Sequence, residues 1–201
     1  MERARRHRAL KYLALGDSYT IGTGASDQSR SWPSIIAQRL NAELTNPAVN
    51  GYTTLDLIRD ELPYLERLRP ELVSILIGVN DLVQGRPPEQ YQDSLSRIYD
   101  AVLDLETPPR VVAISIPTWS YVPAAGDFGG KDRVATLTGV FNAVAEREAR
   151  IRNFTWVDIG EASTSGIGSA GWIASDDLHP GDAQYAAWAE VIWPAVSALM
   201  R

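Results

Sequence analysis

Short apolar runs alternate along the chain with longer segments in which apolar residues recur at helical spacing. The short runs favour buried strands, because they are rich in β-branched and aliphatic residues and stop at glycine, proline or polar positions. The five predicted strands span residues 11–15, 43–49, 72–77, 110–116 and 155–159. The predicted helices span residues 32–40, 54–68, 89–105, 133–150 and 182–200. Prolines 47, 63 and 194 predict a weakened strand, a helix break and a kink.

Strands that alternate with helices of this length indicate a parallel sheet that is covered on both faces. We therefore predict a three-layer α/β/α domain of flavodoxin-like type, with about five parallel strands. In open sheets of this kind, ligands bind beyond the carboxyl ends of the strands. The segments that follow the predicted strands therefore share one edge: 16–19, 50–52, 78–81, 117–119 and the segment that leads to 176–179.

Size and composition indicate one globular domain rather than a membrane protein. The chain has 201 residues, of which 45% are hydrophobic, and this length is enough to bury a substantial core. We expect a flexible basic tail over residues 1–10 and a single catalytic domain over residues 11–201. No apolar run is long enough for a membrane span or a signal peptide, so we predict a cytoplasmic protein. A secreted form trimmed from a longer precursor fits the same residues. The oligomeric state is left open.

Charge and cysteine content narrow the classes of function. The net charge is −6, but residues 1–11 carry five Lys or Arg and one Glu, so the remainder carries −10. An acidic body argues against a nucleic-acid partner, although the tail alone could touch an anionic surface. The chain has no cysteine, which excludes disulfides, thiolate metal sites and cysteine nucleophiles. Its carboxylates and one internal histidine show no metal-ligand spacing, so we predict no metal.

Histidine is scarce, and one of the two histidines follows a pair of aspartates. His7 lies in the basic tail, whereas His179 precedes Pro180 near the end of the chain. Imidazole gains and loses a proton near neutral pH, so His179 is the candidate general base. A carboxylate can hold such a ring in one tautomer. Asp176 suits this role in a tight turn and Asp177 in an extended segment, and the spacing leaves both open.

The first predicted strand ends in Gly-Asp-Ser, which presents the Ser18 hydroxyl at the expected edge. Serine is a weak nucleophile until a base removes its proton during attack, and His179 is the available base. Acyl transfer also requires hydrogen-bond donors for the developing oxyanion. The Ser18 backbone N–H, the Gly51 backbone N–H and the Asn80 amide are the candidates. These residues favour a serine hydrolase.

Four short blocks in the chain together resemble the signature of an enzyme family. They are Gly16-Asp17-Ser18, Gly51, Gly78-Val79-Asn80-Asp81 and Asp176-Asp177-Leu178-His179-Pro180. In this order they resemble the four blocks of the SGNH hydrolases, also called the GDSL esterase/lipase family. The first block departs from the family name because Tyr19 stands where leucine is common. Gly181 stands where asparagine is often found, which leaves Asp182 as the candidate cap of the last helix.

The resemblance implies a role for each matching residue. Ser18 would be the nucleophile, His179 the general base and acid, and Asp176 rather than Asp177 the carboxylate that orients the imidazole. Ser18, Gly51 and Asn80 would supply the oxyanion hole. The implied reaction is hydrolysis of a small-molecule carboxylic ester through an acyl-serine intermediate, without a metal or an organic cofactor.

The substrate is less well defined than the reaction. We expect it to contact aromatic residues near the site: Trp119, Tyr121, Phe128 and Trp172. The alternative is that these rings only pin down the long loop that follows the fourth strand. Short- to medium-chain esters are the leading substrate class. A thioesterase, a lysophospholipase and a carbohydrate O-deacetylase are alternatives with the same chemistry, and a catalytically silent binding module is an alternative from another class.

Overall fold

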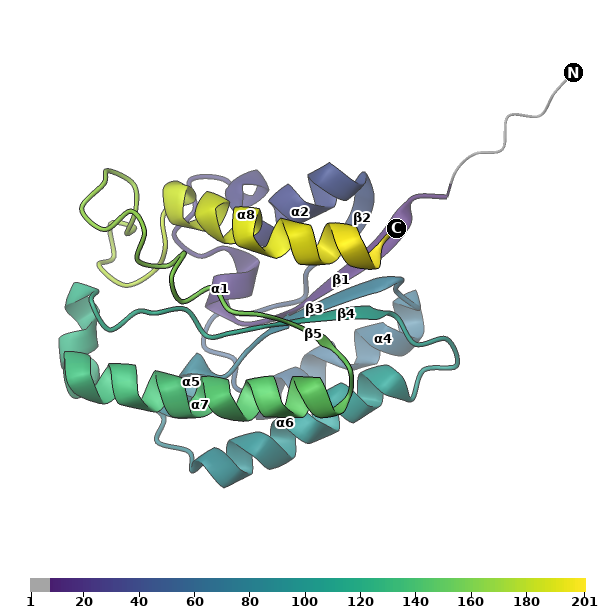
Figure 1. The fold of residues 1–201 in the computed structure, drawn as a ribbon, viewed down its shortest axis with the longest axis horizontal. Helices are drawn as coiled ribbons and strands as arrows, with labels where there is room; N and C mark the ends of the chain where they lie inside the picture. Colours follow the sequence, from purple (N-terminus) through teal and green to yellow (C-terminus); the bar gives the residue numbers. More distant parts are fainter. Residues whose placement is uncertain (1–7) are drawn as a thin grey trace, which may run out of the picture.

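The structure is a computed structural model that describes residues 8–201, and its centre is a five-stranded parallel sheet (Figure 1). The strand order is β2-β1-β3-β4-β5. The strands are β1 (Leu10–Gly16), β2 (Ala42–Thr45), β3 (Leu72–Leu76), β4 (Arg110–Ile114) and β5 (Thr155–Val157). Every residue of β3 is buried, as expected for a central strand with helices on both sides. The predicted three-layer fold is confirmed.

Long helices cover both faces of the sheet. Helix α2 packs beside α8 on one face, and α6 packs beside α7 on the other face, which α4 also covers (Figure 1). These helices are α2 (Trp32–Leu40), α4 (Pro63–Leu68), α6 (Pro88–Leu103), α7 (Lys131–Ile151) and α8 (Asp182–Leu199). Shorter elements lie in the connections: α1 (Ser18–Ile21), η1 (Gln28–Arg30), α3 (Thr54–Asp56), η2 (Leu57–Glu61), α5 (Val79–Val83) and η3 (Pro123–Phe128).

The strand order places the candidate edge at a topological switch point. Strand β2 pairs with one side of β1, and β3 pairs with the other side. Helix α2, which follows β1, and helix α6, which follows β3, cover opposite faces of the sheet, so the chain leaves the carboxyl ends of these two neighbouring strands in opposite directions. Helix α1 follows β1 directly, and α5 follows β3, so both short helices begin at this switch point.

Three predicted elements differ from the structure for local reasons. Strand β2 ends at Thr45 instead of residue 49, because Pro47 has no N–H to continue the strand. The predicted helix over residues 54–68 is divided into α3, η2 and α4, and its break is a π-helical turn ahead of Pro63. Helix α8 contains Pro194 in its interior and ends at Leu199, one residue before the predicted end, and the kink at Pro194 stays a prediction.

The predicted tail lies only partly within the described part of the chain. Residues 1–7 are outside it. Arg8 forms an ion pair with Glu71 at 3.1 Å, and Leu10 already belongs to β1. Strand β1 therefore begins one residue before the predicted domain boundary at residue 11, and the division into a tail and a domain stays a prediction.

Candidate active site

The Ser18 hydroxyl lies at the start of α1, immediately beyond the end of β1. Ser18 is 7% exposed, and Asp17 caps the helix because its Oδ1 accepts a hydrogen bond from Tyr19 N–H at 3.0 Å. Gly16 permits this sharp turn, since a Cβ atom there would lie 2.3 Å from the backbone oxygen of Leu76 in β3. Strand β1 thus delivers Ser18 to the carboxyl edge of the sheet on a tightly constrained backbone.

Asn80 connects the ends of three strands. Its Nδ2 donates to the Tyr52 backbone oxygen at 2.9 Å and lies 3.4 Å from Asp17 Oδ2. Tyr52 follows Gly51 in the connection after β2, and Gly51 itself is exposed. The structure therefore brings the Ser18, Gly51 and Asn80 blocks together at the carboxyl edge of the sheet.

The geometry distinguishes between the two aspartates near His179. Asp176 Oδ2 lies 2.6 Å from His179 Nδ1, and Asp176 Oδ1 accepts from the His179 backbone N–H at 2.9 Å. Asp177 instead adopts a left-handed conformation, with φ of 59°. Partial burial raises the pKa of Asp176, but its hydrogen bonds from His179 and Leu178 outweigh this and hold the pKa below the ordinary value. Asp176 therefore stays ionised beside the ring.

The loop after α1 joins the His179 segment to the other blocks. The Tyr19 ring meets the His179 ring edge-on, with 6.1 Å between the ring centroids. Gly24 lies so close to the His179 segment that a Cβ atom there would be 2.5 Å from Pro180 O. Thr23 Oγ1 donates to Asn50 Oδ1, next to Gly51. Within residues 8–201, no hydrogen bond joins Ser18 Oγ directly to His179.

The expected cap of α8 takes a different partner. Asp182 accepts hydrogen bonds from the backbone and the hydroxyl of Ser26, while the N-cap position is Gly181. Asp182 therefore ties the last helix to the loop after α1 instead of capping its own helix. The physical reason is distance along the chain: a side chain at the first helical position points away from the N–H groups that a cap must reach.

Three carboxyl groups are fully buried near the candidate nucleophile. Asp81 forms an ion pair with Arg86 at 2.7 Å and accepts from Thr54 N–H and Oγ1. Burial raises the pKa of Asp17 to about 7 and that of Glu61 to about 8. Glu61 does not appear among the sequence candidates. The signal that could have identified it is its place between Leu57 and Leu65, at helical spacing on a buried stripe.

The four aromatic residues expected at the substrate pack mainly against protein. Trp119 and Trp172 are 3% and 5% exposed, so they present little surface to a ligand. Trp119 Nε1 donates to Thr138 Oγ1, and the Phe128 ring packs edge-on against the Trp119 ring. Trp172 Nε1 contacts the half-buried Tyr121 hydroxyl at 3.1 Å. These contacts support the alternative in which the aromatic residues pin down the loop.

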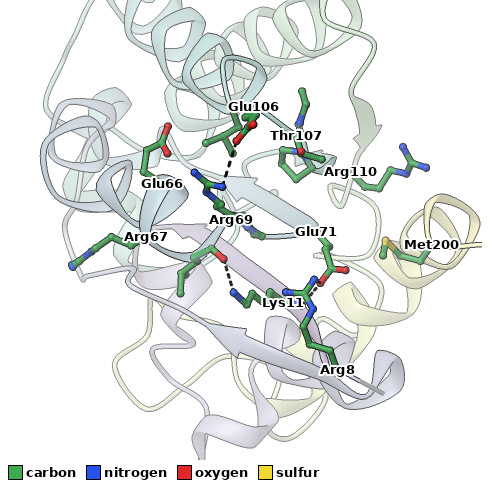
Figure 2. Close-up of a pocket in the computed structure, with 15 residues that line it drawn as sticks. Arg8, Lys11, Glu66, Arg67, Arg69, Glu71, Glu106, Thr107, Arg110 and Met200 are labelled. Atoms are coloured by element: carbon green, nitrogen blue, oxygen red, sulfur yellow. Dashed lines mark hydrogen bonds and ion pairs between the residues drawn. The ribbon is translucent and has the colours of Figure 1, made fainter. Parts of the chain in front are cut away.

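A pocket of about 720 Å³ lies at the opposite edge of the sheet, near the amino ends of β1, β3 and β4 (Figure 2). Two ion pairs lie in its lining: Arg8 pairs with Glu71 at 3.1 Å, and Arg69 pairs with Glu106 at 3.4 Å. This pocket contains none of the candidate catalytic residues.

Two further properties concern only residues 8–201. No helix among them is long and apolar enough to cross a membrane. No group of three or more His, Cys, Asp or Glu side chains among them is arranged to hold a metal ion. The compartment stays a prediction.

Comparison with known proteins identifies the family to which the chain is similar. The sequence model of the GDSL-like lipase/acylhydrolase family matches residues 14–187. Esterase TesA of Pseudomonas aeruginosa is 25% identical over 94% of this chain and 88% of its own length. An arylesterase of Vibrio mimicus is 29% identical over 53% of this chain and 56% of its own length. A crystal structure of TesA covers 94% of this chain and 99% of its own, with a TM-score of 0.74 and 23% identity.

Proposed function

The chain belongs to the GDSL-like lipase/acylhydrolase family and is an ester hydrolase, and on that premise we propose that Ser18, His179 and Asp176 are its catalytic triad. The observation that carries this proposal is the Asp176–His179 contact of 2.6 Å, on the sheet edge to which β1 delivers Ser18. A carboxylate in this position fixes the tautomer in which His179 Nε2 is free to accept a proton.

The proposed reaction proceeds in two halves. Ser18 Oγ attacks the ester carbonyl carbon while His179 Nε2 takes the hydroxyl proton. The tetrahedral intermediate then breaks its bond to the alcohol oxygen, which leaves with the proton from His179. In the second half, His179 takes a proton from water, the hydroxide attacks the acyl-serine, and the proton returns to Ser18 as the carboxylic acid departs. The ionised Asp176 stabilises the imidazolium form in both halves.

The proposed oxyanion hole uses one donor from each of the first three blocks. Ser18 contributes its backbone N–H, Gly51 its backbone N–H and Asn80 its Nδ2. The short contact from Asn80 to Tyr52 O orients the amide, whereas the 3.4 Å approach to Asp17 is long enough for an oxyanion to replace it. Donors aimed in advance at developing charge need no reorganisation during the reaction.

Within residues 8–201, Ser18 Oγ and His179 form no direct hydrogen bond, and this is compatible with the proposed mechanism. Catalytic hydrogen bonds are often long without substrate and shorten in the substrate complex. The loop through Gly24 and the Tyr19–His179 contact hold the two segments against each other.

We propose short- to medium-chain esters as the substrates. Val49 and Leu55, on either side of Gly51 along the chain, are 42% and 47% exposed. We infer that these exposed aliphatic side chains are the contacts for a short acyl group that stays partly in water. Thioesters, lysophospholipids and carbohydrate acetates are the alternatives with the same chemistry.

We expect the wild-type enzyme to hydrolyse nitrophenyl acetate and butyrate faster than nitrophenyl esters of long acyl chains. In the proposed arrangement a short chain covers the exposed Val49 and Leu55, and methylenes that extend beyond them should gain little free energy because they remain in solvent. The measurement is kcat/KM across the acyl series, beside acyl thioesters and acetylated sugars. A maximum at long chains would contradict the assignment, and no turnover of any ester would favour a silent binding module.

The carboxylate assignment predicts a large difference between two neighbouring variants. Asp176→Asn should lower kcat by about 10²–10⁴-fold, because an amide no longer stabilises the imidazolium or the correct tautomer. Asp177→Asn is the matched control, since asparagine readily adopts the left-handed conformation found there and the side chain does not contact His179. Equal losses in steady-state kinetics of the two variants would contradict the assignment.

A further inference from the structure

Glu61 lies behind the Ser18 segment, inside the protein, and no step of the proposed reaction uses it. Its side chain is fully buried in η2, and Glu61 Oε2 accepts a hydrogen bond from the Gly16 backbone N–H at 2.9 Å. Gly16 ends β1 and precedes Asp17 and Ser18. We propose that Glu61 is a positioning residue, whose carboxyl holds the end of β1 and thereby fixes Ser18 for attack. This inference rests on the proposed role of Ser18 as the nucleophile.

The π-helical turn explains how a carboxyl reaches this place. Leu62 N–H donates to the Leu57 backbone oxygen at 3.1 Å, five residues earlier, which widens the helix by one residue. Leu57, Glu61 and Leu65 are all buried, so the turn directs Glu61 inward together with two leucines. Turns of this kind are rare and occur frequently at functional sites. Here the wider turn supplies an acceptor to a buried N–H of β1.

The surroundings of Glu61 favour its neutral form. Glu61 Oε1 is buried and has no hydrogen-bond partner within residues 8–201. An ionised carboxylate with one unpartnered oxygen is strongly unfavourable in such a site, whereas a protonated carboxyl is less so. Because Oε2 accepts from Gly16, the proton belongs on Oε1. The neutral side chain then has an acceptor oxygen toward Gly16 and an O–H donor, and a glutamine amide keeps this arrangement with its carbonyl oxygen and its NH₂ group.

The charged neighbours strengthen this preference. Burial raises the pKa of Glu61 to about 8, the hydrogen bond from Gly16 N–H opposes the rise, and the charges of Asp17 and Asp60 add to it. The titratable groups whose charges interact with Glu61 are Asp17 at the end of β1, Asp60 in the same turn, and Tyr52, whose hydroxyl donates to Asp60 at 2.9 Å. Beyond Asp17, Asp81 forms an ion pair with Arg86.

Ionisation of Glu61 should oppose catalysis and folding in the same pH range. A negative charge behind Ser18 repels the oxyanion that forms in front of it, so kcat/KM should fall above about pH 8. An unfolded glutamate ionises near pH 4.5, whereas the folded protein keeps this proton up to about pH 8. Stability linked to Glu61 is therefore complete below pH 4.5 and decreases as the pH rises to about 8.

Two variants of Glu61 test the proposal. Glu61→Gln keeps the acceptor for Gly16 and never ionises. We expect its kcat at pH 7 to be within about twofold of wild type, and its kcat/KM not to fall above about pH 8. The difference in melting temperature between this variant and wild type should increase in favour of the variant by about 5 °C or more as the pH rises from 5 to 9. Glu61→Met has similar volume but no acceptor. We expect its kcat to fall by about 10- to 100-fold while KM changes by less than about twofold.

A folded Glu61→Met enzyme with wild-type kcat would overturn the proposal. If that variant does not fold, Glu61→Gln decides alone, because an unchanged alkaline fall would also overturn it. Labelling of Ser18 by a fluorophosphonate, in which Oγ displaces fluoride at phosphorus, separates the two hypotheses. A wild-type enzyme that is not labelled contradicts the proposed function. A labelled wild-type enzyme with an equally fast Glu61→Met variant contradicts only the role of Glu61.

Discussion

Replacement of Ser18 by alanine is expected to lower kcat/KM for nitrophenyl butyrate by about 10⁴–10⁶-fold, the range found when a serine nucleophile is removed. The variant loses only the oxygen atom that would form the acyl-enzyme. The buried side chain takes part in no hydrogen bond that holds α1 within residues 8–201, so the fold should persist. Residual turnover should come from the remaining oxyanion donors and from substrate binding.

The matched control for this prediction is Ser169→Ala, which removes the hydroxyl of an exposed serine outside the candidate site. Both variants should keep the wild-type melting temperature, and only Ser18→Ala should lose activity. Mass spectrometry after reaction with a fluorophosphonate should find the adduct on the Ser18 peptide. Ester hydrolysis by Ser18→Ala at a tenth or more of the wild-type rate would exclude Ser18 as the nucleophile.

Replacement of His179 by alanine is expected to have an effect of comparable size, about 10⁴–10⁶-fold in kcat/KM. Without the imidazole, Ser18 has no base for its proton and the alcohol has no acid to protonate it as it leaves. The loss should appear mainly in kcat, because His179 transfers protons during the reaction and contributes little to binding of the ester. Steady-state kinetics with nitrophenyl butyrate measures both parameters.

The sequence provides its own control for His179, since His7 is the only other histidine. His7→Ala should be fully active. The double variant Ser18→Ala, His179→Ala should be no slower than either single variant, because residues that act as a unit lose their effect together. Losses that multiply in the double variant would show that Ser18 and His179 act independently, which would contradict the proposed triad.

The hydrophobic periodicity of the sequence was sufficient to predict the layers of the fold but not its short helices. The long helices and β3 have enough apolar positions for their spacing to be read, and their bounds match closely. Helices α1 and α5 have four and five residues, too few to show a period. Both begin in the motifs that contain Ser18 and Asn80, so the tightest local structure occurs where sequence periodicity is least informative.

The site, like the fold, was predicted only in part from the sequence. The alternation of elements placed Ser18, Gly51, Asn80 and the His179 segment on one edge, and the structure has them there. Spacing alone left both Asp176 and Asp177 open as the partner of His179. The backbone of the turn separates them, since the left-handed conformation of Asp177 leaves Asp176 with three hydrogen bonds to the Leu178–His179 segment.

By itself, the sequence determined the fold class, the edge that carries the site and the residue types available for acyl transfer. These follow from the pattern of burial along each element and from side-chain chemistry. Only the tertiary structure decided that Trp119 and Trp172 are buried and that Glu61 holds Gly16, because these contacts depend on the packing of segments far apart in the chain. The Asp176–His179 pair is local, but it depends on the backbone conformation of the turn, which residue spacing alone does not record.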